Sequence, residues 1–134
     1  MVAHHLTTGT AGEDAATEHL VAHGYSIISR NWRAKQLELD IVCTKGDVVI
    51  FAEVKTRSCS GMGTALTALT TPKIKKLCKA AQLYISQNNL WDTPCRFDLL
   101  AVTKTGTEYQ VEHIQDAFEL SLLMGGGNTT WQPW

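Results

Sequence analysis

The sequence lacks the paired cysteine motifs that mark zinc-binding or disulfide-rich small proteins. Its four cysteines, Cys43, Cys59, Cys78 and Cys95, show no C-x-x-C spacing, and no histidines follow them at the spacing of a zinc finger. Cys43 and Cys78 fall instead at positions of an apolar pattern. We therefore expect buried free thiols in a reducing compartment, in preference to a disulfide or a metal role.

Long apolar runs are also missing. No segment approaches the roughly 20 apolar residues that span a bilayer. The N-terminus has no basic stretch followed by an apolar core, as a signal peptide would have. We therefore expect a cytoplasmic protein with no membrane partner. A chain of 134 residues suffices for one domain, which we place at residues 1–124, followed by a glycine-rich tail at residues 125–134.

The most informative segment present is VVIFAEVKTR, at residues 48–57. Its apolar first half has the composition of a strand buried on both faces. Glu53 and Lys55 then project from one face at the end of that strand, because side chains two positions apart share a face. Burying even one such charge costs several kcal/mol unless it is paired or bound to a metal. The strand is therefore expected to deliver charged groups to a site.

The preceding segment, LELDIVC at residues 37–43, alternates apolar and acidic residues as a half-buried strand does. The cluster TKGD between the two segments contains the glycine that tight hairpins favour. A hairpin closed around Gly46 and Asp47 pairs residues whose numbers sum to 93, which places Asp40 opposite Glu53. A turn one residue longer would change this register.

Two carboxylates directly opposite each other repel and destabilise an antiparallel pair. The arrangement is explained if a divalent cation lies between them, since Mg²⁺ takes oxygen ligands from one or two carboxylates, water and substrate phosphate. In the same register Glu38 lies opposite Lys55, and we expect it to pair with Lys55 or Arg57 behind the metal ligands.

Asp40, twelve intervening residues and Glu53-x-Lys55 resemble the core signature of the PD-(D/E)xK nuclease superfamily. The chain as a whole resembles the YraN-type family of uncharacterised bacterial endonuclease-like proteins, related to archaeal Holliday junction resolvases. The segments that carry this resemblance, in chain order, are GTAGED (9–14), HGYSIISRNWR (23–33), LELDIVCTKGDVVIFAEVKTR (37–57), TPKIKKL (71–77), RFDLLAV (96–102) and HIQDAF (113–118).

The resemblance implies an endonuclease that hydrolyses phosphodiester bonds in branched or structured DNA with Mg²⁺ or Mn²⁺. It implies that Glu13, Asp40, Glu53 and Lys55 form the catalytic set. Asp40 and Glu53 would hold the metal with Glu13, directly or through water, and Lys55 would orient or deprotonate water or neutralise phosphate charge. Glu13 as an ordinary carboxylate that complements a helix dipole remains an alternative.

The formal net charge of −1 argues against a nucleic-acid partner, but the charges are segregated along the chain. Six basic residues and no acidic residue lie between positions 55 and 79: Lys55, Arg57, Lys73, Lys75, Lys76 and Lys79. Such segregation can make one face attractive to phosphate. We expect Arg57, Lys73 and Lys76 to contact nucleic acid; the alternative is that the lysines only solvate a helix face.

The expected fold is α/β: a single restriction-endonuclease-like domain with a central mixed sheet flanked by helices. The resemblance supplies the sheet type, and a homodimer is one option for its assembly. Arg96 and Asp98 flank Phe97 and are expected to form a structural ion pair. The elements expected from the pattern are helices at 10–23, 71–85 and 116–124, and strands at 25–31, 37–43, 48–57, 97–103 and 109–114.

Two other functions compete with the nuclease. One is a non-catalytic nucleic-acid-binding or adaptor protein that retains the nuclease fold, because the presence of ligands does not prove turnover. The other is a metal-dependent phosphohydrolase that acts on a small nucleotide. The basic helix and the glycine-containing loop before it favour a polymer over a small nucleotide.

Overall fold

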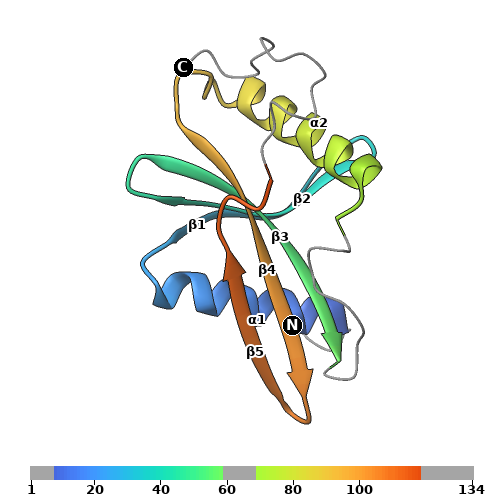
Figure 1. The fold of residues 1–134 in the computed structure, drawn as a ribbon. Helices are drawn as coiled ribbons and strands as arrows, with labels where there is room; N and C mark the ends of the chain where they lie inside the picture. The colour runs from blue at the N-terminus through green and yellow to red at the C-terminus, as the bar shows by residue number, and fades with distance from the viewer. Residues whose placement is uncertain (1–7, 59–68, 119–134) are drawn as a thin grey trace, which may run out of the picture.

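The structure is a computed structural model, and it describes residues 8–58 and 69–118. The elements along the chain are α1 (Thr8–Ala22), β1 (Ser26–Ala34), β2 (Leu37–Lys45), β3 (Val48–Ser58), α2 (Thr71–Gln87), β4 (Cys95–Thr105) and β5 (Glu108–Ile114). Figure 1 shows a twisted sheet with one helix on each side. The predicted fold class, an α/β domain with a mixed sheet flanked by helices, is confirmed.

The sheet has the strand order β1-β2-β3-β4-β5. β1, β2 and β3 form an antiparallel meander. β3 and β4 are parallel, and the connection between them contains α2, since parallel neighbours require a crossover that is commonly a helix. β5 returns antiparallel to β4 through a tight turn at Gly106 and Thr107. The long β3–β4 ladder therefore forms the centre of the sheet, and both of its strands are covered on their two faces.

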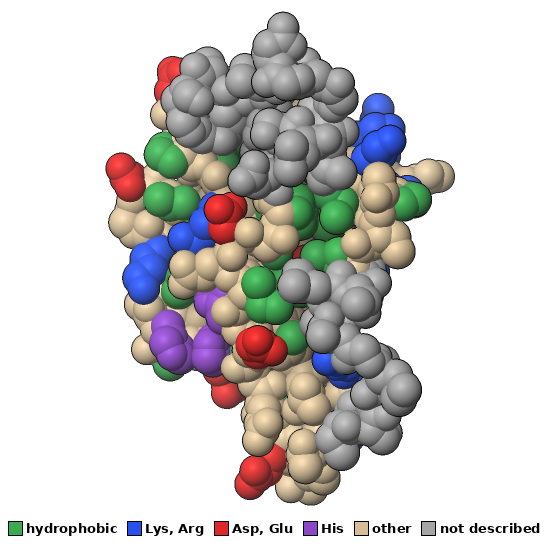
Figure 2. Space-filling view, in the orientation of Figure 1, with side chains coloured by type: hydrophobic (Ala, Val, Ile, Leu, Met, Phe, Trp, Pro, Cys, Tyr) green, Lys and Arg blue, Asp and Glu red, His purple; other side chains and the backbone are tan. Residues whose placement is uncertain are grey.

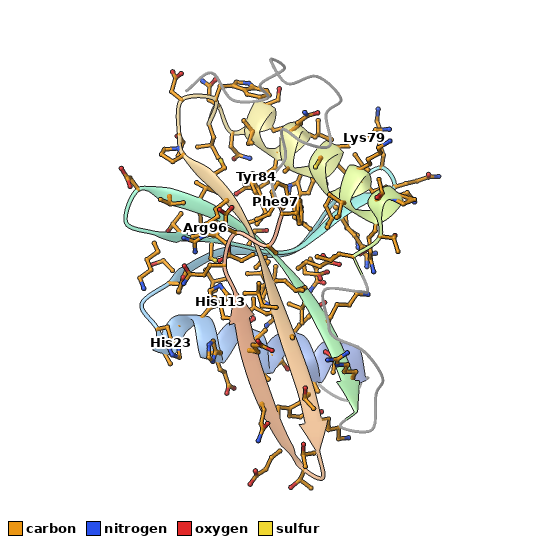
Figure 3. The ribbon with its side chains drawn as sticks, in the orientation of Figure 1. His23, Lys79, Tyr84, Arg96, Phe97 and His113 are labelled. Atoms are coloured by element: carbon orange, nitrogen blue, oxygen red, sulfur yellow. The ribbon has the colours of Figure 1, made fainter. Side chains whose placement is uncertain are left out.

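Each helix covers its own hydrophobic core. On the α2 side, buried residues of the helix, among them Leu77 and Tyr84, pack against Phe51 and Phe97 of the central strands. The ring centroids of Phe51 and Tyr84 are 5.8 Å apart in an edge-to-face arrangement, and Figure 3 shows Tyr84 and Phe97 between α2 and the sheet. On the α1 side, Leu20 and its neighbours pack against alternate residues of the same strands. This alternation is the period-2 pattern expected for strands buried on both faces.

The hairpin register predicted from the sequence is confirmed next to the turn. The β2–β3 pairs Ile41–Ala52, Val42–Phe51 and Cys43–Ile50 all sum to 93, and the strands are joined by two residues, Gly46 and Asp47. Gly46 has a φ of +62°, a conformation that glycine adopts without steric cost.

Most predicted elements are present with boundaries shifted by one to three residues; β1, for example, continues to Ala34 and β4 spans Cys95–Thr105. The N-cap of α2 is Thr70, one residue earlier than the predicted Thr71, with Pro72 in the first turn. A helix from Asp116 was also predicted, but residues 116–118 form a turn and bend, and Asp116 has a φ of +54°. The reason is that the Asp116 N–H donates to the Asp98 carboxylate, at 3.0 Å. Residues 119–124 and the predicted tail at 125–134 lie outside the described residues.

The thiol prediction is confirmed for two cysteines. Cys43 and Cys78 are buried and free, and burial raises the pKa of Cys43 to about 12 and that of Cys78 to about 11. Thiols of this kind are inert packing groups. Cys59 lies outside the described residues. Neither of the two described helices combines the length and apolar character that crossing a membrane requires.

Gly12 sets how closely α1 approaches the sheet. A Cβ at this position would overlap the Thr56 side chain of β3, with the Thr56 Cβ 2.9 Å and its Cγ2 3.0 Å away. The helix can therefore lie against β3 only because residue 12 has no side chain. Glu13 is the next residue, so this contact also fixes the position of its carboxylate relative to β2 and β3.

We predict that Gly12→Ala lowers the free energy of unfolding by about 1–3 kcal/mol through overpacking, although alanine is the better helix former by about 1 kcal/mol. Urea unfolding measures the effect. Adding Thr56→Ala removes the Oγ1 and Cγ2 atoms of the overlapping side chain and leaves its Cβ, so it should restore part of the lost stability. A double-mutant cycle would detect this restoration. A Gly12→Ala variant as stable as the wild type would show that the close approach is not required.

Candidate active site

The site begins where β2 and β3 separate. Their ladder ends at the pair Ile41–Ala52, and Figure 1 shows the two strands diverging on the side away from their turn. At the next position, the Asp40 carboxylate takes the place of a backbone partner: its Oδ2 accepts a hydrogen bond from the Val54 N–H at 2.9 Å. Asp40 is thereby held against β3.

Glu53 lies beside Asp40, and both carboxyl groups line the same pocket. Burial and the neighbouring Asp40 together raise the pKa of Glu53 to about 8. The charges of Lys73 and Lys55 act in the opposite direction. Near neutral pH, without a cation, Glu53 therefore retains its proton.

Glu13 of α1 approaches Asp40 from the other side of the sheet. Burial raises the pKa of Glu13, and the charge of Asp40 raises it further, whereas a hydrogen bond from Asn31 and the charge of Arg30 lower it. The Arg30 Nη2 lies 3.9 Å from Glu13 and 2.8 Å from Asp14. Asp40 is therefore the central carboxylate, close enough to influence both Glu13 and Glu53.

Two lysines, Lys55 and Lys73, also lie near Glu53. Lys55 follows Glu53 on the same face of β3, and Lys73 reaches it from the first turn of α2. Lys73 lies close enough to Lys55 for the two side chains to interact. That interaction and burial lower the pKa of Lys73, while the charges of Glu53 and Asp40 oppose the shift. Two carboxylic acids and two lysines thus form one compact group.

The group opens into a pocket of about 330 Å³ between the end of the β1–β2 hairpin and α2. Asp40, Glu53, Lys73 and Lys76 contribute to its walls, with Leu77 of the core among the apolar lining. Figure 2 shows Lys and Arg side chains near α2, at the upper right of the view. The pocket therefore presents carboxylates and cations to the same space.

The sequence placed Glu38 wrongly. It was expected to pair with Lys55 or Arg57, but the β2–β3 ladder ends before it reaches Glu38. Glu38 instead faces Arg33 of β1, with its Oε2 4.0 Å from the Arg33 Nη2, and both side chains are largely exposed. Arg57 lies two residues beyond Lys55 on β3, half-buried and opposite Thr103 of β4, and it does not line the pocket.

Arg96 and Asp98 form the predicted structural ion pair. The Arg96 Nε and Nη2 each donate to the Asp98 carboxylate at 2.8 Å, and the His113 Nε2 lies 2.6 Å from its Oδ2. Figure 3 shows Arg96 and His113 on neighbouring strands. The Arg96 side chain also donates to the Tyr25 hydroxyl, at 3.2 Å. This network, whose role in bracing β5 was not predicted, ties together segments far apart in sequence.

The three histidines of the described residues do not form a metal centre. The rings of His19 and His23 on α1 stack at 4.1 Å between centroids, and His113 lies 6.3 Å from His19; Figure 2 shows histidines grouped on one face. Within residues 8–58 and 69–118, no three His, Cys, Asp or Glu side chains are placed to hold a metal ion by themselves. A cation at Asp40 and Glu53 would have to complete its coordination with water, backbone or substrate oxygens.

The placement of Lys73 beside Lys55 was missed by sequence reasoning, which assigned Lys73 only to nucleic-acid contact. A partial signal was present: Thr71-Pro72 marks a helix start, and residues in the first turn of a helix that follows a central strand can lie over that strand's end. Which side chain of the turn points to Glu53 depends on how α2 packs on the sheet, and the lysine-rich sequence does not distinguish the candidates.

We predict that the stability of the metal-free protein falls as pH rises from about 4.5 to about 8 on account of Glu53. The unfolded carboxyl group ionises near 4.5 and the folded one near 8, so within that window the folded state binds more protons than the unfolded state. Glu53→Gln removes this dependence. The free energy of unfolding of this variant should be near that of the wild type at pH 4.5. At pH 8 it should be larger by a few kcal/mol at most, since a tenfold change in proton affinity is worth about 1.4 kcal/mol.

Unfolding by urea in EDTA at several pH values provides the measurement, with Asp47→Asn in the exposed hairpin turn as a matched control. If Glu53→Gln were instead the less stable protein at pH 8, Glu53 would be an ionised partner of the neighbouring lysines.

Comparisons with known proteins identify the family. Residues 12–102, which include Glu13, Asp40, Glu53, Lys55 and Lys73, match the model described as "Uncharacterised protein family UPF0102". A UPF0102 protein of Nitratidesulfovibrio vulgaris is 48% identical over 127 residues, covering 95% of each chain. UPF0102 proteins of Lawsonia intracellularis and Bacteroides fragilis are 39% and 42% identical, over 94% and 87% of this chain and 96% of each relative. The chain therefore belongs to the UPF0102 family, which is the YraN family that its motifs resemble.

Proposed function

We propose that this protein is a metal-dependent endonuclease that hydrolyses phosphodiester bonds in nucleic acid, with structured DNA as its expected substrate. The observation that carries the proposal is that Asp40 and Glu53 lie side by side in the lining of one pocket, with Lys55 on the same strand face as Glu53. Two acids forced together at low solvent exposure are unfavourable for stability alone. They are favourable when a cation binds between them.

The residues present fit Mg²⁺ or Mn²⁺. All candidate donors are oxygens, which hard cations prefer, and one or two carboxylates are the usual protein contribution to a Mg²⁺ site. Asp40 and Glu53 would hold the ion directly, and Glu13 would contribute through water, since it lies close enough to Asp40 for that charge to raise the pKa of its carboxyl group. When bound, such an ion supplies an activated water and neutralises charge on phosphate oxygens.

The protein side chains have distinct roles in this proposal. The Val54 N–H fixes the Asp40 carboxylate, so that its second oxygen points away from that bond and remains available. Glu53 gives up its proton when the ion binds. Lys55 orients the attacking water or neutralises charge on the phosphate that it attacks. The pocket wall formed by α2 brings further positive charge to the phosphate chain through Lys76.

The nuclease proposal predicts cleavage that requires Mg²⁺ or Mn²⁺ and is lost in Glu53→Gln, Asp40→Asn and Lys55→Met. We expect each variant to lose at least about 10²-fold in rate, the scale of removing one group that stabilises transition-state charge. The assay is a panel of linear, flapped and four-way-junction DNAs with the equivalent RNAs. Thermal melting in EDTA establishes that each variant is folded.

Glu38→Gln is the matched control, because Glu38 lines the same pocket but pairs with Arg33 at the rim. It should retain activity within a few-fold. A wild type that binds the panel but cleaves none of it would favour the alternative of a non-catalytic nucleic-acid-binding protein. Cleavage of free nucleotides only would favour a small-molecule phosphohydrolase.

A separate prediction concerns binding. If Lys76 contacts a backbone phosphate, Lys76→Ala should weaken duplex binding and lower the slope of log K against log salt by about 0.9, the value for one released counterion on duplex DNA. Fluorescence anisotropy in EDTA at several salt concentrations measures both quantities. An unchanged affinity and slope would mean that Lys76 only solvates the face of α2.

A further inference from the structure

Lys73 differs from the other lysines of α2 in its surroundings. Its side chain is half-buried, lines the pocket and lies close to Lys55, whereas the side chains of Lys75, Lys76 and Lys79 are exposed. Figure 3 shows Lys79 on the outer side of the helix, away from the sheet. The charges of Glu53 and Asp40 also act on Lys73, in the direction that raises its pKa. Its nitrogen therefore belongs to the same group of side chains as the proposed metal ligands.

The proximity of Lys55 and Lys73 is not explained by ion pairing. Within the described residues, neither lysine has a carboxylate oxygen within 4.0 Å of its nitrogen, although two acids lie nearby. Two neighbouring ammonium groups repel each other, and the half-buried position of Lys73 costs further solvation. An anion bound beside them relieves both costs. The pocket that Lys73 lines with Asp40 and Glu53 is open to such an anion.

We propose that Lys73 is a second catalytic lysine, which together with Lys55 clamps the scissile phosphate from the side opposite to Asp40 and Glu53. The inference rests on the proposed nuclease function and adds a residue from α2 to a set otherwise drawn from α1, β2 and β3. Carboxylates on one side of the pocket hold a cation, and two ammonium groups on the other hold the phosphate that the cation also contacts.

The two lysines would act on charge that develops during the reaction. The oxygen of water forms a bond to phosphorus and gives up a proton, while the bond from phosphorus to the leaving oxygen breaks and that oxygen takes up a proton. Negative charge on the non-bridging oxygens is greatest between these events, so cations fixed beside them stabilise the transition state more than the bound substrate. Lys73 should therefore affect the rate of cleavage more than the affinity for nucleic acid.

The test compares Lys73→Met with Lys79→Met, which removes the same charge from the exposed side of the same helix. Single-turnover cleavage with the protein in saturating excess gives the rate of the chemical step, and anisotropy in EDTA gives affinity. We expect Lys73→Met to lose about 10²-fold in rate, at least tenfold more than it loses in affinity, and Lys73→Arg to recover part of the rate. Lys79→Met should match the wild type in both measurements.

A loss of rate below tenfold at saturation would overturn the inference, whether or not affinity falls; a fall in affinity alone would make Lys73 an ordinary phosphate contact. In either case wild-type cleavage would leave the nuclease proposal standing. A wild type that cleaves nothing would overturn that proposal and this one with it. Thermal melting checks that each variant is folded, and Lys73→Gln replaces Lys73→Met if the methionine variant does not fold.

Discussion

The hydrogen bond from the Val54 N–H to the Asp40 carboxylate is the interaction on which the site depends. Asp40 is one residue and Val54 two residues from the last backbone pair of β2 and β3, so a side chain replaces the backbone where the ladder would otherwise continue. A strand N–H that is shielded from water needs an acceptor, and for the half-buried Val54 the acceptor is an acid. The separation of the strands and the fixed orientation of Asp40 are therefore two results of one local substitution of side chain for backbone.

From this point the site draws on both faces of the sheet. Glu13 arrives from α1, at a distance permitted by the missing side chain of Gly12. Glu53 and Lys55 share the opposite face of β3, and Lys73 joins them from α2. Asp40 can influence Glu13 and Glu53 together because it lies at the gap between strands, where no continuous sheet separates the two sides. A gap in the sheet is thus a structural requirement of the cluster.

The sequence predicted those parts of the candidate site that depend on residues near one another in the chain, and missed those that depend on packing between distant elements. The hairpin register depends on local alternation and on Gly46, so the proximity of Asp40 and Glu53 could be predicted. The alternation of apolar and acidic residues in β2 continues past the point where the β2–β3 ladder ends, so the sequence does not show that end. For this reason Glu38 was assigned the wrong partner. Lys73 lies twenty residues from Glu53, and its position depends on the packing of α2 rather than on any local pattern.

Asp98 and Glu53 are two carboxyl groups shielded from solvent whose surroundings in the fold differ. Burial by itself raises the pKa of Asp98, but hydrogen bonds from His113, Arg96 and the Asp116 backbone hold it below the usual range. Its charge is fully matched, and it has no capacity left for a ligand. Glu53 is half-buried beside another acid, Asp40, and the pKa of Glu53 rises to about 8. A carboxylate whose partners are supplied by the fold stabilises structure, whereas a carboxylate beside a like charge gains stability when a proton or a cation binds. By this criterion Asp98 is structural, and Glu53 is the acid to which we assign the proposed cation.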